Sequence, residues 1–221
     1  MWAAMSDPFS PELDRLVAGY RRFRANGWSS NRERWADLRD GQDPQVMVIA
    51  CSDSRVDPSQ IFDVDPGEIF VVRNVAAMVP PYETTPGHHG VSAALEFAVQ
   101  FLNVKEVVVM GHGMCGGCKA ALTRQMEGAE HGAGGFVADW IALLDEARDE
   151  VAHTHGTEGR PAERAMEQAG VKASLKNLRT FPYIAEKEQS GALRLSGAFF
   201  AISDGVLHVL DESDGAFHPV E

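Results

Sequence analysis

Hydrophobic positions are spaced differently in the two parts of the chain. In the opening segment they recur every three or four residues, a period that indicates amphipathic helices. Ser10 is a favourable N-cap and Pro11 fits the first helical position. The positions of this first apolar stripe are Leu13, Leu16, Val17, Tyr20 and Phe23. A second, short helix is predicted over Arg32–Leu38, so we expect residues 1–40 to form an N-terminal helical arm.

Continuous apolar runs replace this pattern at Val46–Ala50, Ile69–Val72 and Val107–Met110. Such runs are typical of parallel strands that are covered on both faces. A helical spacing returns between the second and third runs, at Val91, Ala94, Leu95, Ala98, Phe101 and Leu102. Strand, helix and strand in this order predict right-handed crossovers and a parallel sheet, whose ligand sites lie beyond the carboxyl ends of its strands.

The last part of the chain begins with further helices. A loop rich in Gly and Ala is predicted over Glu127–Gly135. Helices are predicted over Phe136–Ala152 and Glu163–Leu178, and the polar segment His153–Pro161 separates them.

Two apolar runs close the chain, Leu193–Ile202 and Val206–Leu210, with Asp204-Gly205 between them. This dipeptide favours a type I′ turn, so the two runs predict a C-terminal hairpin. The sequence thus predicts an α/β fold with a mostly parallel central sheet flanked by helices. We expect one domain over residues 1–221, in which the arm precedes an α/β core over residues 41–221.

Composition supports a folded chain. Of 221 residues, 44% are hydrophobic and 24% are charged, which supplies a core and excludes a disordered chain. The 20 Lys and Arg against 32 Asp and Glu give a net charge of −12, so we expect no nucleic-acid partner. No apolar run reaches the roughly 18 residues of a membrane span, so we expect no membrane partner. Met1–Pro8 lacks a signal-peptide pattern and three cysteines are too few for a disulfide scaffold, so we expect a cytoplasmic protein.

Candidate chemistry follows two of the predicted strands. Cys51 comes directly after the first strand, and His112 and Cys115 follow the third. Two thiolates and one imidazole suit zinc, and three protein ligands leave a fourth tetrahedral position open, which favours a catalytic site over a structural one. We expect one Zn²⁺ per chain.

Cys118 leaves two alternatives open. Cys115 and Cys118 have the C-x-x-C spacing of a redox pair, although that motif usually opens the helix after the first strand. Cys118 is also a possible fourth ligand that would close a structural zinc site. We favour a third interpretation, in which Cys118 is a small side chain packed on the helix that starts near Gly116.

Asp53 and Arg55 lie beside the first predicted ligand, two residues apart. An arginine paired with a carboxylate lowers the pKa of that carboxylate and fixes its orientation. A carboxylate held ionised next to a metal site can orient a reactive oxygen by accepting a hydrogen bond from it. Without the neighbouring Cys51, this pair would read as a plain turn salt bridge.

These motifs resemble those of the β-class carbonic anhydrases. The resemblance extends over residues 41–121 and is more diffuse elsewhere. The matching runs are Gly41-Gln42, Cys51-Ser-Asp-Ser-Arg55, Pro66-Gly-Glu68, Phe70-Val-Val-Arg-Asn74, Met78-Val-Pro-Pro-Tyr82, Ala93-Ala-Leu-Glu96, Gly111-His112 and Cys115-Gly-Gly117. It implies that Cys51, His112 and Cys115 bind zinc and that Asp53 and Arg55 are the catalytic pair.

Within that family the chain resembles the plant-type subclass. The resemblance implies a substrate pocket formed by Gln42, Phe70, Val75, Phe97 and Gly116. The pattern departs from the family at three positions. Phe97 stands where the pocket usually has Tyr, Ala77 where a second Asn is usual, and Cys118 where an aliphatic residue is usual.

The resemblance implies reversible hydration of carbon dioxide to bicarbonate and a proton, in which zinc lowers the pKa of a bound water to about 7 and the hydroxide attacks the substrate. It also implies a homodimer or a higher even oligomer, with N-terminal helices that embrace the partner and an active site at the interface. Two other functions remain open, namely hydrolysis of carbon disulfide or carbonyl sulfide on the same fold, and a non-catalytic interaction module with structural zinc.

The resemblance also bears on regulation. Some bacterial members close the site below about pH 8 by moving the aspartate onto zinc, and a Trp three residues before the first cysteine helps to bind the inhibiting bicarbonate. Val48 occupies that position here, whereas Arg73 matches an arginine that both subclasses share. We therefore expect Asp53 to stay paired with Arg55.

Overall fold

The N-terminal helices form a unit of their own. The computed structural model describes residues 10–220, so the expectation for Met1–Pro8 lies outside the described residues. The chain divides into two units, Met1–Gln42 and Asp43–Glu221. The helices of the first unit are α1 (Pro11–Ala25), α2 (Gly27–Ser30) and α3 (Arg32–Leu38). Ser10 caps α1 as expected, because its Oγ accepts the Leu13 N–H at 3.2 Å.

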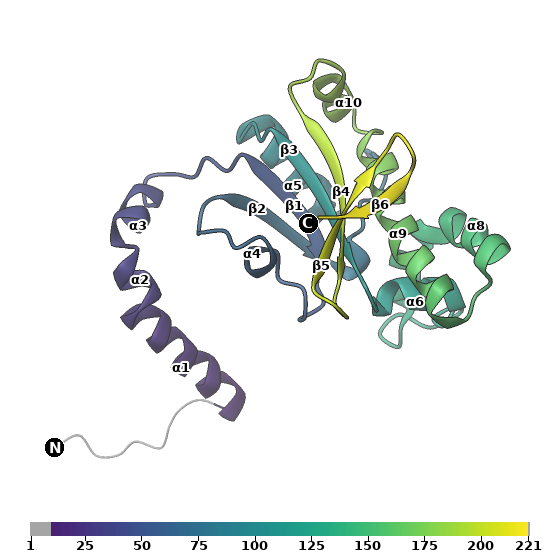
Figure 1. Cartoon of the computed structure of the whole chain (residues 1–221), viewed down its shortest axis with the longest axis horizontal. Coiled ribbons are helices and arrows are strands. Elements are labelled where there is room, and N and C mark those ends of the chain that lie inside the picture. Colours follow the sequence, from purple (N-terminus) through teal and green to yellow (C-terminus); the bar gives the residue numbers. More distant parts are fainter. Residues whose placement is uncertain (1–9, 221) are drawn as a thin grey trace. The chain divides into compact units, whose positions relative to one another are not determined.

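The second unit is built on one sheet. Its strands are β1 (Val46–Cys51), β2 (Ile69–Asn74), β3 (Glu106–His112), β4 (Arg194–Ala201), β5 (Val206–Asp211) and β6 (Ala216–Pro219). They lie in the order β2-β1-β3-β4-β5-β6 (Figure 1). Strands β2, β1, β3 and β4 are parallel, whereas β5 and β6 are antiparallel to their neighbours. The predicted mostly parallel α/β fold is confirmed.

Helices connect the strands. They are α4 (Pro58–Ile61), α5 (Gly90–Glu96), α6 (Gly116–Thr123), α7 (Gly135–Ile141), α8 (Asp145–His155), α9 (Gly159–Leu178) and α10 (Pro182–Gln189). A 3₁₀ turn over Val75–Ala77 follows β2, and a π-helical turn over Phe97–Phe101 extends α5. Long helix α9 packs on β3 and β4, and its residues Glu167 and Val171 lie next to Gly111 near the end of β3.

The prediction of one continuous helix over Phe136–Ala152 is wrong, because the segment forms two helices. A 3₁₀ turn at Ala142–Leu144 separates α7 from α8. Ile141 and Leu144 are both buried, so the apolar spacing continues across this turn. Acidic residues at the start of α8 then favour a new helix N-terminus there. Helix α10 was not predicted, although Pro182 occupies its first turn.

The predicted hairpin exists, but its turn is not of type I′. Strands β4 and β5 are joined by four residues, 202–205, and the N–H of Gly205 donates to the Ala201 carbonyl at 2.8 Å. Gly205 has a φ of +74°, whereas Asp204 does not have a positive φ. A type I′ turn requires positive φ at both central residues, so the dipeptide closes a longer loop instead. Strand β6 was not predicted.

The two faces of the sheet bury alternate residues of each strand. Met47 and Ile49 of β1 pack with Val107 and Val109 of β3 on the face that α9 covers. Val48 and Ala50 pack with Met110 and Ala198 on the other face. Both sets are buried, which explains the continuous apolar runs in the sequence.

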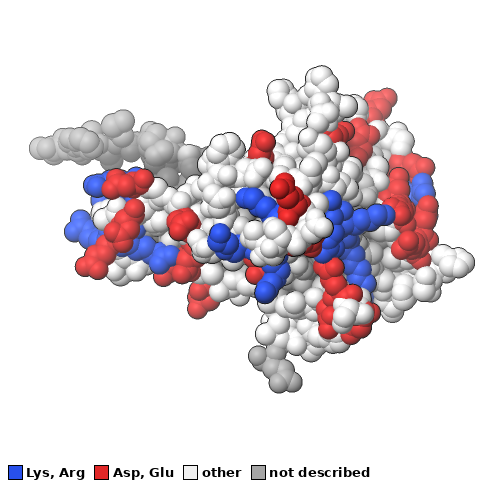
Figure 2. Space-filling view, turned by 90° about the horizontal axis from the view of Figure 1, so that it is seen from above, with Lys and Arg blue, Asp and Glu red and all other residues white. Residues whose placement is uncertain are grey.

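The charged side chains are mixed over the surface. On the face shown in Figure 2, acidic and basic groups lie next to one another with uncharged areas between them. None of the helices within residues 10–220 is long and apolar enough to cross a membrane.

Candidate metal centre

Two neighbouring strands bring the predicted ligands together. Strands β1 and β3 are parallel, and Ala50 pairs with Met110, so Cys51 and His112 stand at the same edge of the sheet. Cys115 lies at the N-cap of α6, directly after β3. The two Sγ atoms are 4.0 Å apart, and one ligand atom from each of the three residues lies within 4.8 Å of the others. All three side chains are buried.

The donor set fits zinc. The Nδ1–H of His112 donates to the Gly113 carbonyl at 2.9 Å, while its Nε2 is buried without a hydrogen-bond partner. A buried nitrogen lone pair facing two thiols needs a compensating ligand. Tetrahedral zinc accepts this combination of Cys and His donors, with a fourth position left for a non-protein ligand.

The thiols are protonated when no metal is bound. The hydrogen bond to Cys115, together with burial, raises the pKa of Cys51 to about 12. The hydrogen bond to Cys118 is the main cause that raises the pKa of Cys115 to about 12. Contact with the Cys51 thiol raises the pKa of His112 although burial opposes this. A metal must therefore displace protons to bind here.

Close packing fixes the loop that joins β3 to α6, residues 113–115, which we call the ligand loop. A Cβ on Gly117 would stand 2.8 Å from Cγ1 of Val75, so only glycine allows the 3₁₀ turn after β2 to lie against α6. Met114 has a φ of +58°, a left-handed conformation that is unusual for a side chain of this size. The loop is therefore held by its surroundings rather than by local preference.

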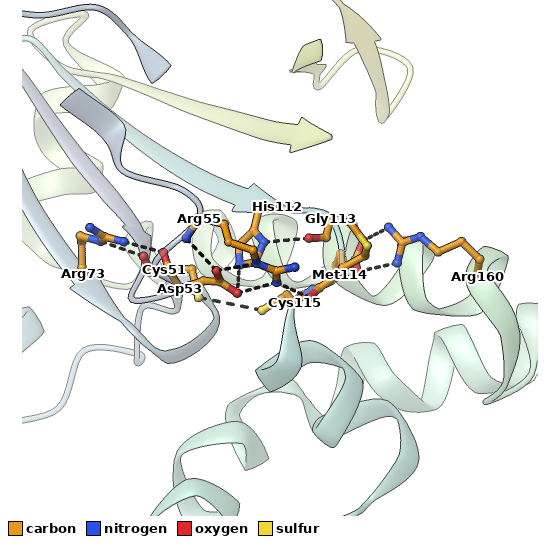
Figure 3. A network of polar contacts seen from close by, with 10 residues as sticks. Cys51, Asp53, Arg55, Arg73, His112, Gly113, Met114, Cys115 and Arg160 are labelled. Atoms are coloured by element: carbon orange, nitrogen blue, oxygen red, sulfur yellow. Dashed lines mark hydrogen bonds and ion pairs between the residues drawn. The ribbon is translucent and has the colours of Figure 1, made fainter. Parts of the chain in front are cut away.

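Asp53 and Arg55 form a bidentate pair at the mouth of this site (Figure 3). Arg55 donates from Nε to Oδ1 at 2.9 Å and from Nη2 to Oδ2 at 2.7 Å. These bonds hold the pKa of Asp53 well below its usual range. Asp53 Oδ2 also lies 3.9 Å from His112 Nε2, so the ionised carboxylate faces the metal position. Arg55 further donates to the Met114 carbonyl at 3.0 Å, which ties the pair to the ligand loop.

Arg73 supports the segment that carries Cys51 and Asp53. Its guanidinium donates to the Cys51 carbonyl at 2.9 Å and to the Asp53 carbonyl at 2.7 Å. A third bond reaches Asp57 Oδ2 at 3.0 Å. The sequence predicted no such support, because a hydrogen bond to a backbone carbonyl leaves no spacing signal.

The four predicted pocket residues of the second unit lie in two different places. Val75 lies against the start of α6, near Gly116. Phe70, in contrast, precedes Asn74 by four residues on β2, which is about 13 Å along the strand. The ring of Phe97 packs on Phe70, with centroids 5.9 Å apart. Both aromatics therefore lie away from the metal edge, by which we mean the sheet edge that carries Cys51 and His112. Gln42 is exposed and belongs to the N-terminal unit.

Cys118 lies outside the donor cluster. Among the described residues, the cluster at this edge contains Cys51, His112 and Cys115 and does not include Cys118. Cys118 is buried on α6, and its Sγ would be 3.7 Å from a Cβ placed on Gly170 of α9. This environment agrees with a packed side chain, and the geometry does not favour a closed four-ligand site.

A parallel α/β sheet with a Cys₂His donor set and an ionised carboxylate beside it fits a catalytic zinc site. Residues 46–207 match the family model described as carbonic anhydrase. The chain is 34% identical over 200 residues to β carbonic anhydrase 5, chloroplastic, of Arabidopsis thaliana, a match that covers 90% of this chain. The chain therefore belongs to the carbonic anhydrase family, and its relatives place it in the β class.

Solved structures agree with this assignment. The β-carbonic anhydrase CcaA superposes with a TM-score of 0.87 at 31% identity, covering 96% of this chain and 93% of that one. Tetrameric β-carbonic anhydrases from Sordaria macrospora give a TM-score of 0.77 at 27% identity, covering 91% and 98% of the two chains. The match to the Arabidopsis relative spans 64% of that longer protein.

Proposed function

We propose that this protein catalyses the reversible hydration of carbon dioxide to bicarbonate and a proton, with one Zn²⁺ per chain held by Cys51, His112 and Cys115. The observation that carries the proposal is the position of the Asp53 carboxylate, which is fixed by Arg55 and faces the open side of the three donors. A purely structural zinc site has no need of such a pair.

Zinc at this site would act as a Lewis acid that lowers the pKa of a coordinated water towards about 7. The chain itself supplies orientation. Asp53 offers an ionised oxygen that accepts a hydrogen bond at the metal position, and it stays ionised because Arg55 compensates its charge. Val75 contributes apolar surface next to the ligand loop, as a neutral substrate requires.

The test is stopped-flow hydration of carbon dioxide by zinc-loaded protein, with the zinc content measured on the same sample. We expect turnover that depends on zinc and is lost in Cys51→Ser. Parallel assays with carbonyl sulfide and carbon disulfide address the alternative substrates. Zinc-loaded protein that hydrates no carbon dioxide would contradict the proposal, and activity on the sulfur compounds alone would support the alternative.

We further propose that two chains complete each pocket in an even-numbered oligomer. Three aromatic side chains that stand away from their own metal edge support this. Phe97 stacks between Phe70 and Phe101, and Phe97 and Phe101 are 44% and 70% exposed. The apolar stripe of α1 is also exposed, with 71% of Leu16 accessible. The Sordaria relatives are tetramers.

Light scattering tests the assembly. We expect an even number of chains, and a shift towards monomer with loss of activity in Phe101→Glu. Gln125→Glu, which adds the same charge at an exposed site on the loop after α6, serves as the control. A fully active monomer would contradict the shared pocket.

A further inference from the structure

A buried carboxylate, paired with a half-exposed arginine, lies next to the metal ligands. Glu167 of α9 is one of the few buried charged residues within residues 10–220, with a side chain that is 2% exposed. Arg160 lies at the N-terminal end of the same helix, and its guanidinium donates to both carboxylate oxygens of Glu167 at 2.7 Å. Burial of a carboxylate is unfavourable unless its charge and lone pairs are compensated, and this bidentate pair compensates them.

Glu167 also reaches a metal ligand. Its Oε1 accepts the backbone N–H of Cys115 at 3.3 Å. This N–H is at the N-cap of α6 and has no place in the hydrogen bonds of that helix. A buried N–H without a partner is costly, so Glu167 stabilises the backbone at the point where the ligand side chain begins.

The ligand loop needs such support. Met114 is left-handed, and each of the three loop residues is tied to a different part of the fold. The N–H of Gly113 donates to the carbonyl of Phe200 at 2.9 Å, and the carbonyl of Met114 accepts a hydrogen bond from Arg55. The bond to Glu167 is the third of these anchors.

Arg160 lies against the same loop. A Cβ on Gly113 would come within 3.3 Å of Arg160 Nη2, and Figure 3 shows Arg160 directed at the loop from the side opposite Arg55. The loop is therefore held between two arginines. Arg55 acts on it directly, whereas Arg160 acts through Glu167 and lies close to Gly113.

A neighbouring carboxylate provides a contrast. Glu163, also on α9, bonds Arg160 at 3.4 Å and pairs with Lys119 of α6 at 2.9 Å. It belongs to the same charge network, but its hydrogen bonds and ion pairs go to Arg160 and Lys119 rather than to an atom of the ligand loop. A role in folding alone would apply to both glutamates, whereas a role at the metal would apply to Glu167.

We propose that Glu167, held in place by Arg160, is a positioning residue of the metal centre that fixes the backbone of Cys115 and so aims its Sγ at the other two ligands. The inference deepens the proposed function, since it concerns the same metal site. A preorganised ligand loop should bind the metal more tightly, and loss of an outer support of this kind typically weakens metal binding by about 10–100-fold.

Two substitutions separate the length of the Glu167 side chain from its charge. Glu167→Gln keeps the length of the side chain and an oxygen that accepts the Cys115 N–H, but it removes the charge. Glu167→Asp keeps the charge next to Arg160 but is shorter by one methylene, which breaks the contact with Cys115. Glu163→Gln is the matched control.

The measurements are the zinc affinity of the full chain, from competition with a chelator, and the absorption spectrum of the Co²⁺-substituted protein. We expect Glu167→Asp to weaken zinc binding by about tenfold or more and to alter the thiolate-to-cobalt bands. Glu167→Gln should keep both within about threefold of the unsubstituted protein, and Glu163→Gln should leave them unchanged.

The reverse order, in which Glu167→Gln binds zinc more weakly than Glu167→Asp, would show that the charge pair matters only for folding. This result would overturn the proposal. Unchanged affinity and spectrum in both variants would overturn it as well. Because metal binding is measured without an assay of turnover, a failure of the proposed carbon dioxide activity would be seen separately, in the unsubstituted protein.

Discussion

Arg55 and Asp53 form a two-point salt bridge, with contacts of 2.9 and 2.7 Å, that holds a carboxylate 3.9 Å from the free nitrogen of His112. The same guanidinium binds the carbonyl of Met114. One arginine thus links the segment after β1 to the loop after β3. The orientation of the carboxylate and the position of the ligand loop are coupled through it.

Asp53→Asn tests the role of this carboxylate. The amide has the same shape but lacks the charge, and it is not a zinc ligand in the geometry described above. We expect zinc to stay bound and turnover in carbon dioxide hydration to fall by about 10–100-fold. Stopped-flow rates and metal content on one sample give both values.

Asp149→Asn is the control for this substitution. Asp149 also pairs with an arginine, Arg148 at 2.8 Å, and the pKa of Asp149 is likewise lowered by that neighbour. It lies on α8, away from the metal ligands. Equal turnover in Asp53→Asn and Asp149→Asn would reduce the Asp53–Arg55 pair to a structural salt bridge.

Metal binding should release protons. The pKa values of Cys51 and Cys115 are raised to about 12, so both thiols are protonated near neutral pH in the metal-free chain. Because zinc binds thiolates, we expect about two protons to be released per zinc at about pH 8, and the affinity to fall as the pH falls. Calorimetry in buffers with different ionisation enthalpies measures this number. A value near zero would mean that the thiols are already ionised.

The two cysteines of the C-x-x-C spacing should behave differently. Cys115→Ser removes a zinc ligand, so we expect zinc and activity to be lost together. Cys118→Ser should keep both, because Cys118 is packed on α9 outside the donor cluster. A buried hydroxyl in its place should lower the free energy of unfolding by about 1–3 kcal/mol. Zinc analysis and denaturant unfolding of the two variants decide this, and an empty site in Cys118→Ser would restore the four-ligand alternative.

Bicarbonate should not close this site. Val48 is buried in the core of the sheet, and Arg73 is occupied by the Cys51 and Asp53 carbonyls and by Asp57. Since the pKa of Asp53 is held low by Arg55, the carboxylate does not titrate between about pH 6.5 and pH 9. We expect the hydration rate to fall with decreasing pH as a single-proton curve. A steep loss near pH 8 that bicarbonate deepens beyond product inhibition would contradict this.

Much of the fold was accessible from the sequence because its signals are local. The apolar runs at Val46–Ala50 and Val107–Met110 mark strands that are buried on both faces, and the Ser10–Pro11 pair marks a helix start. The break between α7 and α8 was missed because the apolar spacing continues through Ile141 and Leu144, so the helical period does not record the 3₁₀ turn. Strand β6 and helix α10 were missed as well.

The same division applies to the site. The sequence by itself determined the identity of the donors and the end of the sheet at which they stand, because residue chemistry and the direction of parallel strands are enough for both. Only the tertiary structure decided that Phe70 and Phe97 lie away from their own metal edge and that Glu167 supports Cys115. These relations join residues that are far apart along the chain. They depend on how β2 and α9 pack against β1 and β3, and that packing is set by the whole core at once rather than by any local pattern.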